Sequence, residues 1–199
     1  MRAKKVATDV RQEQIAMAAL ELVAERGIKA LQVADIAKRV GVVPSAIYRH
    51  YKGKGDILDT VLQLIGQRLQ ENVLGVCDET SDALQRLELL LMRHARLLTT
   101  YRAIPSVIFS EEIYGGTPEQ RNKASSIVKP YMRAIMRIVS EGQQAGAIRD
   151  DLHARTVAVM VMGIIQPAAI IAHLERGRFD LGNHVQQAWP VLRRGIEVR

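Results

Sequence analysis

The chain has 199 residues, of which 48% are hydrophobic and 25% charged, and its formal net charge is +7. This balance predicts a soluble globular protein of one large domain or two smaller ones, and the single cysteine, Cys77, excludes an internal disulfide framework. The first residues are basic but have no apolar stretch behind them, so they are no secretory signal and we expect a cytoplasmic protein.

Almost all of the positive charge lies in the first quarter of the chain. Residues 1–55 carry 11 Lys and Arg against 5 Asp and Glu, whereas the other 144 residues carry 17 against 16. Such an asymmetry is typical of a chain that presents one end to a polyanion, although a solvated basic face has the same composition. Composition alone leaves both interpretations open.

Helical periodicity dominates the chain, and no convincing alternating strand is present. The first helix has apolar residues at helical spacing, namely Ile15, Ala18, Ala19, Leu22 and Val23. Gly27 follows where a left-handed C-terminal cap belongs. Two short helices are expected at Val33–Val40 and Pro44–Tyr51, and a long fourth helix from Asp56 onward.

The rest of the chain is also predicted to be helical. Thr117, Pro118 and Gln120 form a capping box, which predicts a helix that runs to about Gln144. Pro190 must kink or break the final helix. The other expected helices run from Ser81, from Ile104 to Gly115, from beyond Asp151 to near Gly177, and from beyond Asn183. The sequence therefore predicts an all-α fold.

The second and third helices have the spacing of a helix-turn-helix. A small residue, Ala37, allows the two helices to approach, and Gly41 four residues later suits a turn that requires positive φ. Any corner between two helices could show part of this pattern. The expected core of the motif consists of Ile36, Ala37, Val40, Gly41, Ile47 and Tyr51.

One face of the third helix is suited to a DNA major groove. Projection of the helix places Ile47 and Tyr51 towards the core, and Ser45, Tyr48 and Arg49 on the opposite side. Small residues permit close approach, Arg49 can donate two hydrogen bonds to a guanine edge, and Tyr48 can hold a phosphate. A solvated helix that carries an arginine by chance explains neither the net charge nor the small residues.

The segment from Arg11 to Leu62 resembles the N-terminal domain of the TetR-type (TetR/AcrR family) transcriptional regulators. The resemblance rests on IAMAALELVAERG, VADIAKRVGV and SAIYRHYKGKGDIL, in the right order and spacing. It implies nine helices, a homodimer, a helix-turn-helix domain over 1–53, and an effector-binding and dimerisation domain over 54–199. The expected DNA-binding residues are Gln32, Val33, Val43, Pro44, Ser45, Ala46, Tyr48, Arg49, His50, Lys52 and Lys54.

The chain departs from the family pattern at three positions. Gln32 stands where the family usually has Thr, and Gln is a poor N-cap for the second helix. Gly55 replaces the usual Glu and loosens the first turn of the fourth helix. Tyr51 replaces the commoner Phe, which we expect to be benign.

The resemblance also implies a small-molecule pocket in the second domain. Methionines adapt to irregular cavities, and polar residues within apolar helices could anchor a ligand, although a methionine stripe or a satisfied core histidine is the commoner explanation. A mostly apolar pocket favours a lipophilic or aromatic small-molecule effector. The candidates are His94, Arg102, Phe109, Tyr114, Met132, Met136, Met160, Gln166 and His173.

The apolar run from Val157 to Ala172 could be mistaken for a membrane span. Gln166 and Pro167 cut it in two, so we expect a helix buried against another helix and no membrane partner. Its apolar surface exceeds what one helical stripe can bury within a monomer, which predicts a homodimer formed by the last two long helices. The interface candidates are Val161, Ile165, Ile170, Leu174 and Trp189.

Two other classes of function compete with a transcriptional repressor. An all-helical enzyme is disfavoured because the five histidines have no metal-ligand spacing and because Glu111 and Glu112 point about 100° apart; we expect no catalysis, metal or cofactor. A nucleoid-type protein that coats DNA without sequence preference is the nearer alternative. The ratio of specific to non-specific affinity for double-stranded DNA distinguishes it from a regulator that binds a palindromic operator.

Overall fold

A computed structural model describes residues 2–114, 118–175 and 178–198. Within these ranges the ordered elements are helices, and the β-pairing is a single isolated bridge between Ile148 and Glu197. The all-α prediction is therefore confirmed.

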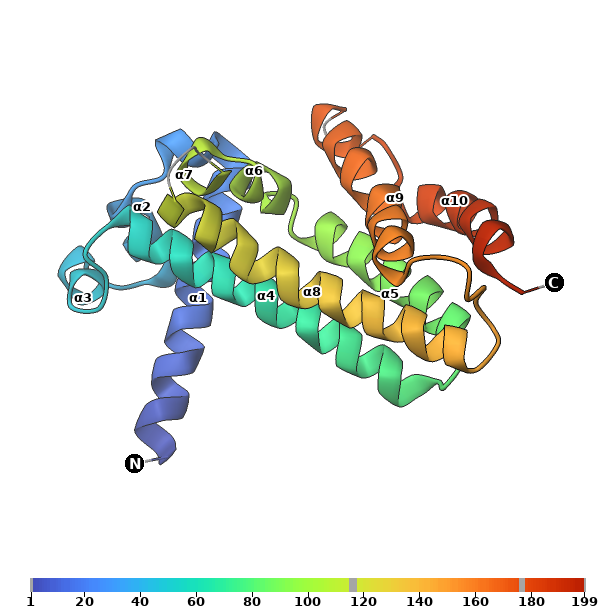
Figure 1. Ribbon diagram of the computed structural model, residues 1–199. Helices are drawn as coiled ribbons and strands as arrows, with labels where there is room; N and C mark the ends of the chain where they lie inside the picture. The colour runs from blue at the N-terminus through green and yellow to red at the C-terminus, as the bar shows by residue number, and fades with distance from the viewer. Residues whose placement is uncertain (1, 115–117, 176–177, 199) are drawn as a thin grey trace. The chain divides into compact units, whose positions relative to one another are not determined.

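The helices follow one another with short connections (Figure 1). Between α5 and α8 the chain forms two short helices where one was expected, because it turns at Phe109 and Ser110. Counted together as one, these two bring the described part of the chain to the nine helices implied by the family resemblance. The bounds are α1 Arg2–Arg26, η1 Ile28–Ala30, α2 Val33–Val40, α3 Pro44–Tyr48, α4 Lys54–Glu79, α5 Ala83–Thr100, α6 Ile104–Ile108, α7 Glu111–Tyr114, α8 Pro118–Gln144, α9 Ala154–Leu174 and α10 Leu181–Ile196.

The chain forms two compact units, and each unit combines two separate stretches. Unit 1 contains Met1–Gln67 and Tyr101–Ile127, and unit 2 contains Arg68–Thr100 and Val128–Arg199. Both α4 and α8 begin in unit 1 and end in unit 2. Each of these helices is therefore a continuous element that belongs to both units.

Several helix ends differ from the sequence-based prediction. The third helix ends at Tyr48 instead of Tyr51, because the amides of His50 and Tyr51 both donate to the Ile47 carbonyl and tighten the last turn. The fourth helix begins at Lys54, two residues early, despite Gly55. There the Asp56 carboxylate accepts from the Lys52 amide at 2.8 Å, which ties the first turn of α4 to the chain just before it.

The two C-terminal helices pass through their prolines without interruption. Pro167 lies inside α9 and Pro190 inside α10, so neither residue ends its helix. The last helix also begins earlier than expected, because Asp180 acts as its N-cap and accepts from the Asn183 amide at 3.0 Å. The predicted endpoint Gly177 and the capping residue Thr117 lie outside the described residues.

Gly27 has a positive φ, but it is not a left-handed helix cap. Its φ of 79° is combined with a ψ of 161°, an extended geometry open mainly to glycine. The chain therefore passes from α1 directly into η1. A glycine with positive φ was predicted correctly at this position, but the predicted left-handed cap was wrong.

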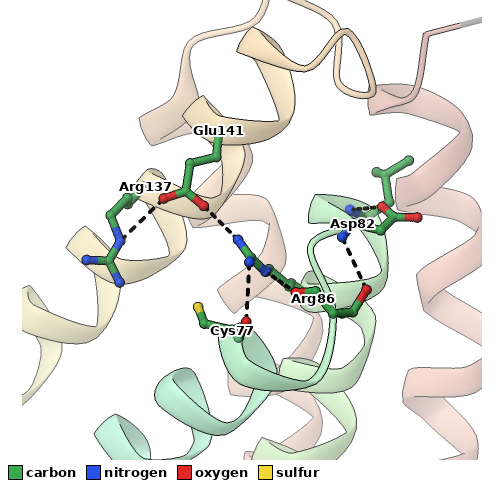
Figure 2. Close-up of polar contacts among 7 residues, drawn as sticks. Cys77, Asp82, Arg86, Arg137 and Glu141 are labelled. Carbon is green, nitrogen blue, oxygen red and sulfur yellow. Dashed lines mark hydrogen bonds and ion pairs between the residues drawn. The ribbon is translucent and has the colours of Figure 1, made fainter.

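Arg86 holds three helices together in unit 2 (Figure 2). From α5 its guanidinium donates to the carbonyl oxygens of Thr80 at 2.6 Å and Cys77 at 3.3 Å, which lie at the C-terminal end of α4. It also donates to the Glu141 carboxylate of α8 at 2.7 Å. The arginine thus satisfies carbonyl groups that a helix end leaves without partners, and it fixes that end to α8.

A polar pair lies within the otherwise apolar core of unit 2. His94 of α5 and Tyr131 of α8 are both buried, with the histidine Nδ1 3.3 Å from the tyrosine hydroxyl. Burial lowers the pKa of His94 to about 4 and raises the pKa of Tyr131. At neutral pH both side chains are therefore uncharged.

Tyr51 carries a buried hydroxyl that has no hydrogen-bond partner among the described residues, although the side chain is only 5% exposed. We expect Tyr51→Phe to raise the free energy of unfolding by about 1 kcal/mol, because an unsatisfied buried hydroxyl destabilises the folded state. Thermal unfolding measured by calorimetry should show a midpoint higher by about 3 °C.

Tyr48→Phe is the matched control, because the Tyr48 side chain is 56% exposed and its hydroxyl stays hydrated. That change should alter stability by less than about 0.5 kcal/mol. A lower midpoint for Tyr51→Phe would show that its hydroxyl is satisfied after all.

Candidate functional site

The turn between α2 and α3 has the geometry that a helix-turn-helix needs. Gly41 has φ 75° and ψ 34°, in the left-handed region, and the Val42 amide donates to the Ala37 carbonyl at 2.9 Å. The side chains of Ile36, Ala37 and Ile47 are at most 1% exposed. This packing fixes the direction in which α3 presents its other face.

The outer face of α3 is open to solvent. Tyr48 and Arg49 are exposed, while Ile47 of the same helix is buried and Ala46 is half-buried. A small side chain therefore lies beside an arginine on the exposed surface, as close approach to base edges requires. The other expected contacts that are exposed here are Gln32, Val43, Pro44, Ser45, His50 and Lys52.

Two of the expected DNA contacts also have structural tasks in the folded chain. Val33 is only 8% exposed and belongs to the core of the motif. Lys54 donates from Nζ to the Ile28 carbonyl at 2.6 Å, which ties the start of α4 to η1. Both residues lie close in sequence to exposed contacts, and spacing alone did not reveal their burial or their partners. Val40, an expected core residue, is half-buried.

Charge compensation differs between the two sides of the motif. Arg39 of α2 donates to the carboxylates of Glu25 and Glu21 at 2.8 and 2.9 Å, and these bonds raise the pKa of its guanidinium. Among the described residues, Arg49 and Lys52 have no carboxylate within 4 Å. Arg49 and Lys52 are thus two cations of unit 1 whose charge a phosphate backbone could take up.

The candidate effector residues are divided between the two units. In unit 2, His94 is buried against Tyr131, which the sequence analysis missed, and Met132 and Met136 of α8 are half-buried. The remaining candidates are mostly at the surface: Arg102, Phe109, Met160 and His173 are exposed, Gln166 is half-buried, and the side chain of Tyr114 lies outside the described part.

A groove of about 400 Å³ lies between α4 and α8 in unit 1. Leu62, Gly66 and Ile127 supply its apolar part. Lys123 of α8 and Asp59 of α4 form an ion pair of 2.9 Å at the same groove, and the carboxylate raises the pKa of Lys123. Acidic and basic residues 64 positions apart gave no local sequence signal for this contact.

The exposed face of α9 is strongly apolar. The helix has 21 residues and is long and apolar enough by composition to cross a membrane, and 33% of its apolar window is buried within the chain. Leu174 is 73% exposed, and Ile170 is also exposed. Three interface candidates instead belong to the core of the single chain, since Val161, Ile165 and Trp189 are at most 2% exposed.

Two family models match the chain and together cover most of it. Residues 15–61 match the model described as bacterial regulatory proteins, tetR family. Residues 58–195 match the model described as YsiA-like protein, C-terminal region. The first match contains the helix-turn-helix, and the second contains all of α5 to α9.

Related proteins agree with these matches. The chain is 31% identical to the fatty acid metabolism regulator protein of Bacillus subtilis (strain 168) over 172 residues, which is 84% of this chain and 86% of that protein. It is 26% identical to the repressor KstR2 of Mycobacterium tuberculosis (strain H37Rv) over 135 residues, 67% of each chain.

A solved structure of the transcriptional regulator FadR from Bacillus subtilis, in complex with stearoyl-CoA, superposes with a TM-score of 0.80 at 29% identity and covers 93% of this chain and 99% of that one. The helix-turn-helix geometry, the family matches and these relatives lead to one assignment. The protein is a DNA-binding transcriptional regulator and belongs to the TetR family of bacterial regulatory proteins.

Proposed function

We propose that this regulator is a homodimeric, cytoplasmic repressor that a long-chain acyl-CoA releases from a pseudo-palindromic operator. The observation that carries the proposal is the 31% identity, over 84% of the chain, to a fatty acid metabolism regulator. A similar structure was solved with stearoyl-CoA, which fits the lipophilic effector expected from the apolar helices of unit 2. In this proposal, residues 54–199 bind the effector and form the dimer, and residues 1–53 bind the operator.

The exposed face of α3 recognises the base sequence of the operator in this proposal. Arg49 can donate to a guanine edge in the major groove, while Lys52 follows the helix at a position suited to a backbone phosphate. Both side chains are exposed and have no carboxylate within 4 Å among the described residues. A dimer would place one α3 in each half-site, with the half-sites about one helical turn of DNA apart or a multiple of it.

The apolar face of α9 supplies the dimer contact. A two-fold dimer presents the same patch on both subunits, so one exposed apolar face can cover its own copy. The face contains Val159, Met160, Ile170, Ile171 and Leu174, each at least 40% exposed in the single chain. Such a patch is unfavourable in water and is typical of an interaction surface.

Helix α4 is the element proposed to carry the ligand signal. It begins at Lys54 in unit 1 and ends at Glu79 in unit 2, without a break. A ligand that shifts its unit 2 end would change the separation of the two α3 helices of the dimer. Coupling of about 1–3 kcal/mol is enough to change operator affinity roughly 5- to 150-fold.

A preferred binding site is first selected from random DNA duplexes. Arg49→Ala and Lys52→Ala then test how α3 recognises this operator. Arg49→Ala should cost about 1–3 kcal/mol on that site and relax base preference at one position of each half-site. Lys52→Ala should weaken binding to operator and random DNA by about the same factor and flatten the salt dependence. Gel-shift titrations at several salt concentrations provide both readouts.

An equal loss on operator and random DNA for Arg49→Ala would contradict its role in base recognition. A wild-type protein that binds both kinds of DNA equally well would favour the nucleoid-type alternative.

Ile170→Asp and Leu174→Asp should convert the dimer to monomers, because each change occurs twice in a two-fold interface and buries an unpaired carboxylate. We expect the dimer dissociation constant to rise by more than about tenfold, with loss of operator binding. Sedimentation velocity measures the change. Leu74→Asp on α4 is the control, since Leu74 is also an exposed apolar residue; dissociation of that variant alone would place the interface elsewhere.

Stearoyl-CoA should weaken operator binding roughly 5- to 150-fold, and operator DNA should weaken stearoyl-CoA binding by the same factor, because the coupling is reciprocal. Calorimetric titrations with and without operator measure both affinities. Equal stearoyl-CoA affinity in the two titrations would rule out this ligand as the releasing effector.

A further inference from the structure

Helix α8 contains a second basic segment, separate from the one at the N-terminus. Residues 120–140, between Glu119 and Glu141, include five Lys and Arg and no Asp or Glu. The rest of the chain beyond residue 55 has 12 Lys and Arg against 16 Asp and Glu. A concentrated positive charge therefore interrupts an otherwise acidic region.

Three of these basic residues form a row on the solvent side of α8. Lys129, Arg133 and Arg137 follow one another at a spacing of four, and all three are exposed. The opposite side of the helix packs into the core, where Ile135 and Ile138 are completely buried. Like charges at this spacing destabilise a helix slightly, so the row contributes nothing to folding by itself.

The row is neutralised at one end only. Arg137 lies 3.8 Å from the Glu141 carboxylate, which also accepts from Arg86, as Figure 2 shows. Among the described residues, Lys129 and Arg133 have no carboxylate within 4 Å. Lys123, in the same basic segment, has two such partners, Asp59 and Glu119. Lys129 and Arg133 are thus a pair of adjacent, exposed and uncompensated cations.

An apolar strip runs beside this pair on the same helix. Met132 and Met136 are half-buried and, at 100° per residue, lie between the buried face and the basic row. Flexible methionine side chains adapt to an alkyl chain of variable shape. This part of α8 therefore places an apolar strip next to two exposed cations, an arrangement that matches a ligand with an alkyl tail and an anionic head.

We propose that Lys129 and Arg133 bind the phosphate groups of the coenzyme A part of the effector, with the acyl chain on the Met132–Met136 side. The inference rests on the acyl-CoA ligand of the proposed function and assigns the anionic half of that ligand to named residues. Charge-assisted hydrogen bonds from Arg and Lys to phosphate oxygens are short and strong, and an arginine can make two at once.

Charge reversal tests the assignment through the choice of ligand. Wild type, Lys129→Glu, Arg133→Glu and Arg133→Lys are titrated with stearoyl-CoA, with stearate and with coenzyme A alone, by calorimetry and by release from operator. Each reversal should weaken stearoyl-CoA binding by about tenfold or more, since a hydrogen bond to a charged group is lost and a repulsion is gained. Binding of stearate should stay within about twofold of wild type, and Arg133→Lys should retain most of the stearoyl-CoA affinity.

Arg96→Glu is the matched control, because Arg96 is an exposed arginine of α5 in unit 2 and the substitution changes the net charge equally. A loss for Arg96→Glu as large as for Arg133→Glu would mean a general charge effect and would overturn the assignment. An equal loss for stearate and stearoyl-CoA would do the same, because it would reflect damage to the pocket.

Three further outcomes distinguish this proposal from the alternative explanations. Weaker operator binding by Lys129→Glu and Arg133→Glu without any ligand, with a flatter salt dependence, would identify the pair as DNA contacts and overturn the inference. A wild-type protein that binds no stearoyl-CoA would refute the proposed ligand and this inference with it. Normal wild-type binding that both reversals leave unchanged would refute the inference alone.

Discussion

The anchoring of α4 at both of its ends is the constraint on which the rest of the structure depends. At the start, Lys54 donates to the Ile28 carbonyl and Asp56 accepts from the Lys52 amide. At the end, Arg86 holds the last carbonyl groups, and Arg93 of α5 forms an ion pair with Glu79. A helix of 26 residues held in this way cannot lose one turn without breaking contacts in one of the units.

Positive charge has two distinct uses in this chain. Arg39, Arg86 and Lys54 are engaged by carboxylates or carbonyl groups and hold helices in place. Arg49 and Lys52 belong to the other class, which is exposed and has no carboxylate within 4 Å in the described ranges. Net charge gives no indication of this division, because a guanidinium contributes the same charge whether it is paired or free.

The sequence was most informative where local chemistry decides the structure. Gly41 adopts the left-handed conformation that its place in the turn requires, and α8 ends at Gln144, as predicted. Helix ends were less predictable, because partners such as Asp180 and Ile47 decide them through single hydrogen bonds. Pro190 was expected to kink or break the last helix, and α10 continues through it, since tertiary packing outweighs the loss of one backbone bond.

Long-range contacts were beyond the reach of periodicity. The apolar run of α9 was interpreted correctly as helix, but its period does not show which side faces α10 and which faces outward. For that reason Val161 and Ile165 were expected at the dimer surface, whereas they pack inside unit 2. The partner of His94, Tyr131, lies 37 residues away on another helix, at a distance that the sequence pattern could not reveal.

The buried His94 makes the fold sensitive to acid. Its pKa of about 4 in the folded protein lies below the ordinary value of 6.5, so between these values the unfolded chain binds more protons than the native one. The stability that a neutral His94 allows is therefore complete above about pH 6.5 and is lost progressively as the pH falls towards 4, by on the order of 3 kcal/mol. Acidification of the solution would therefore destabilise this regulator through a residue buried in the core of unit 2.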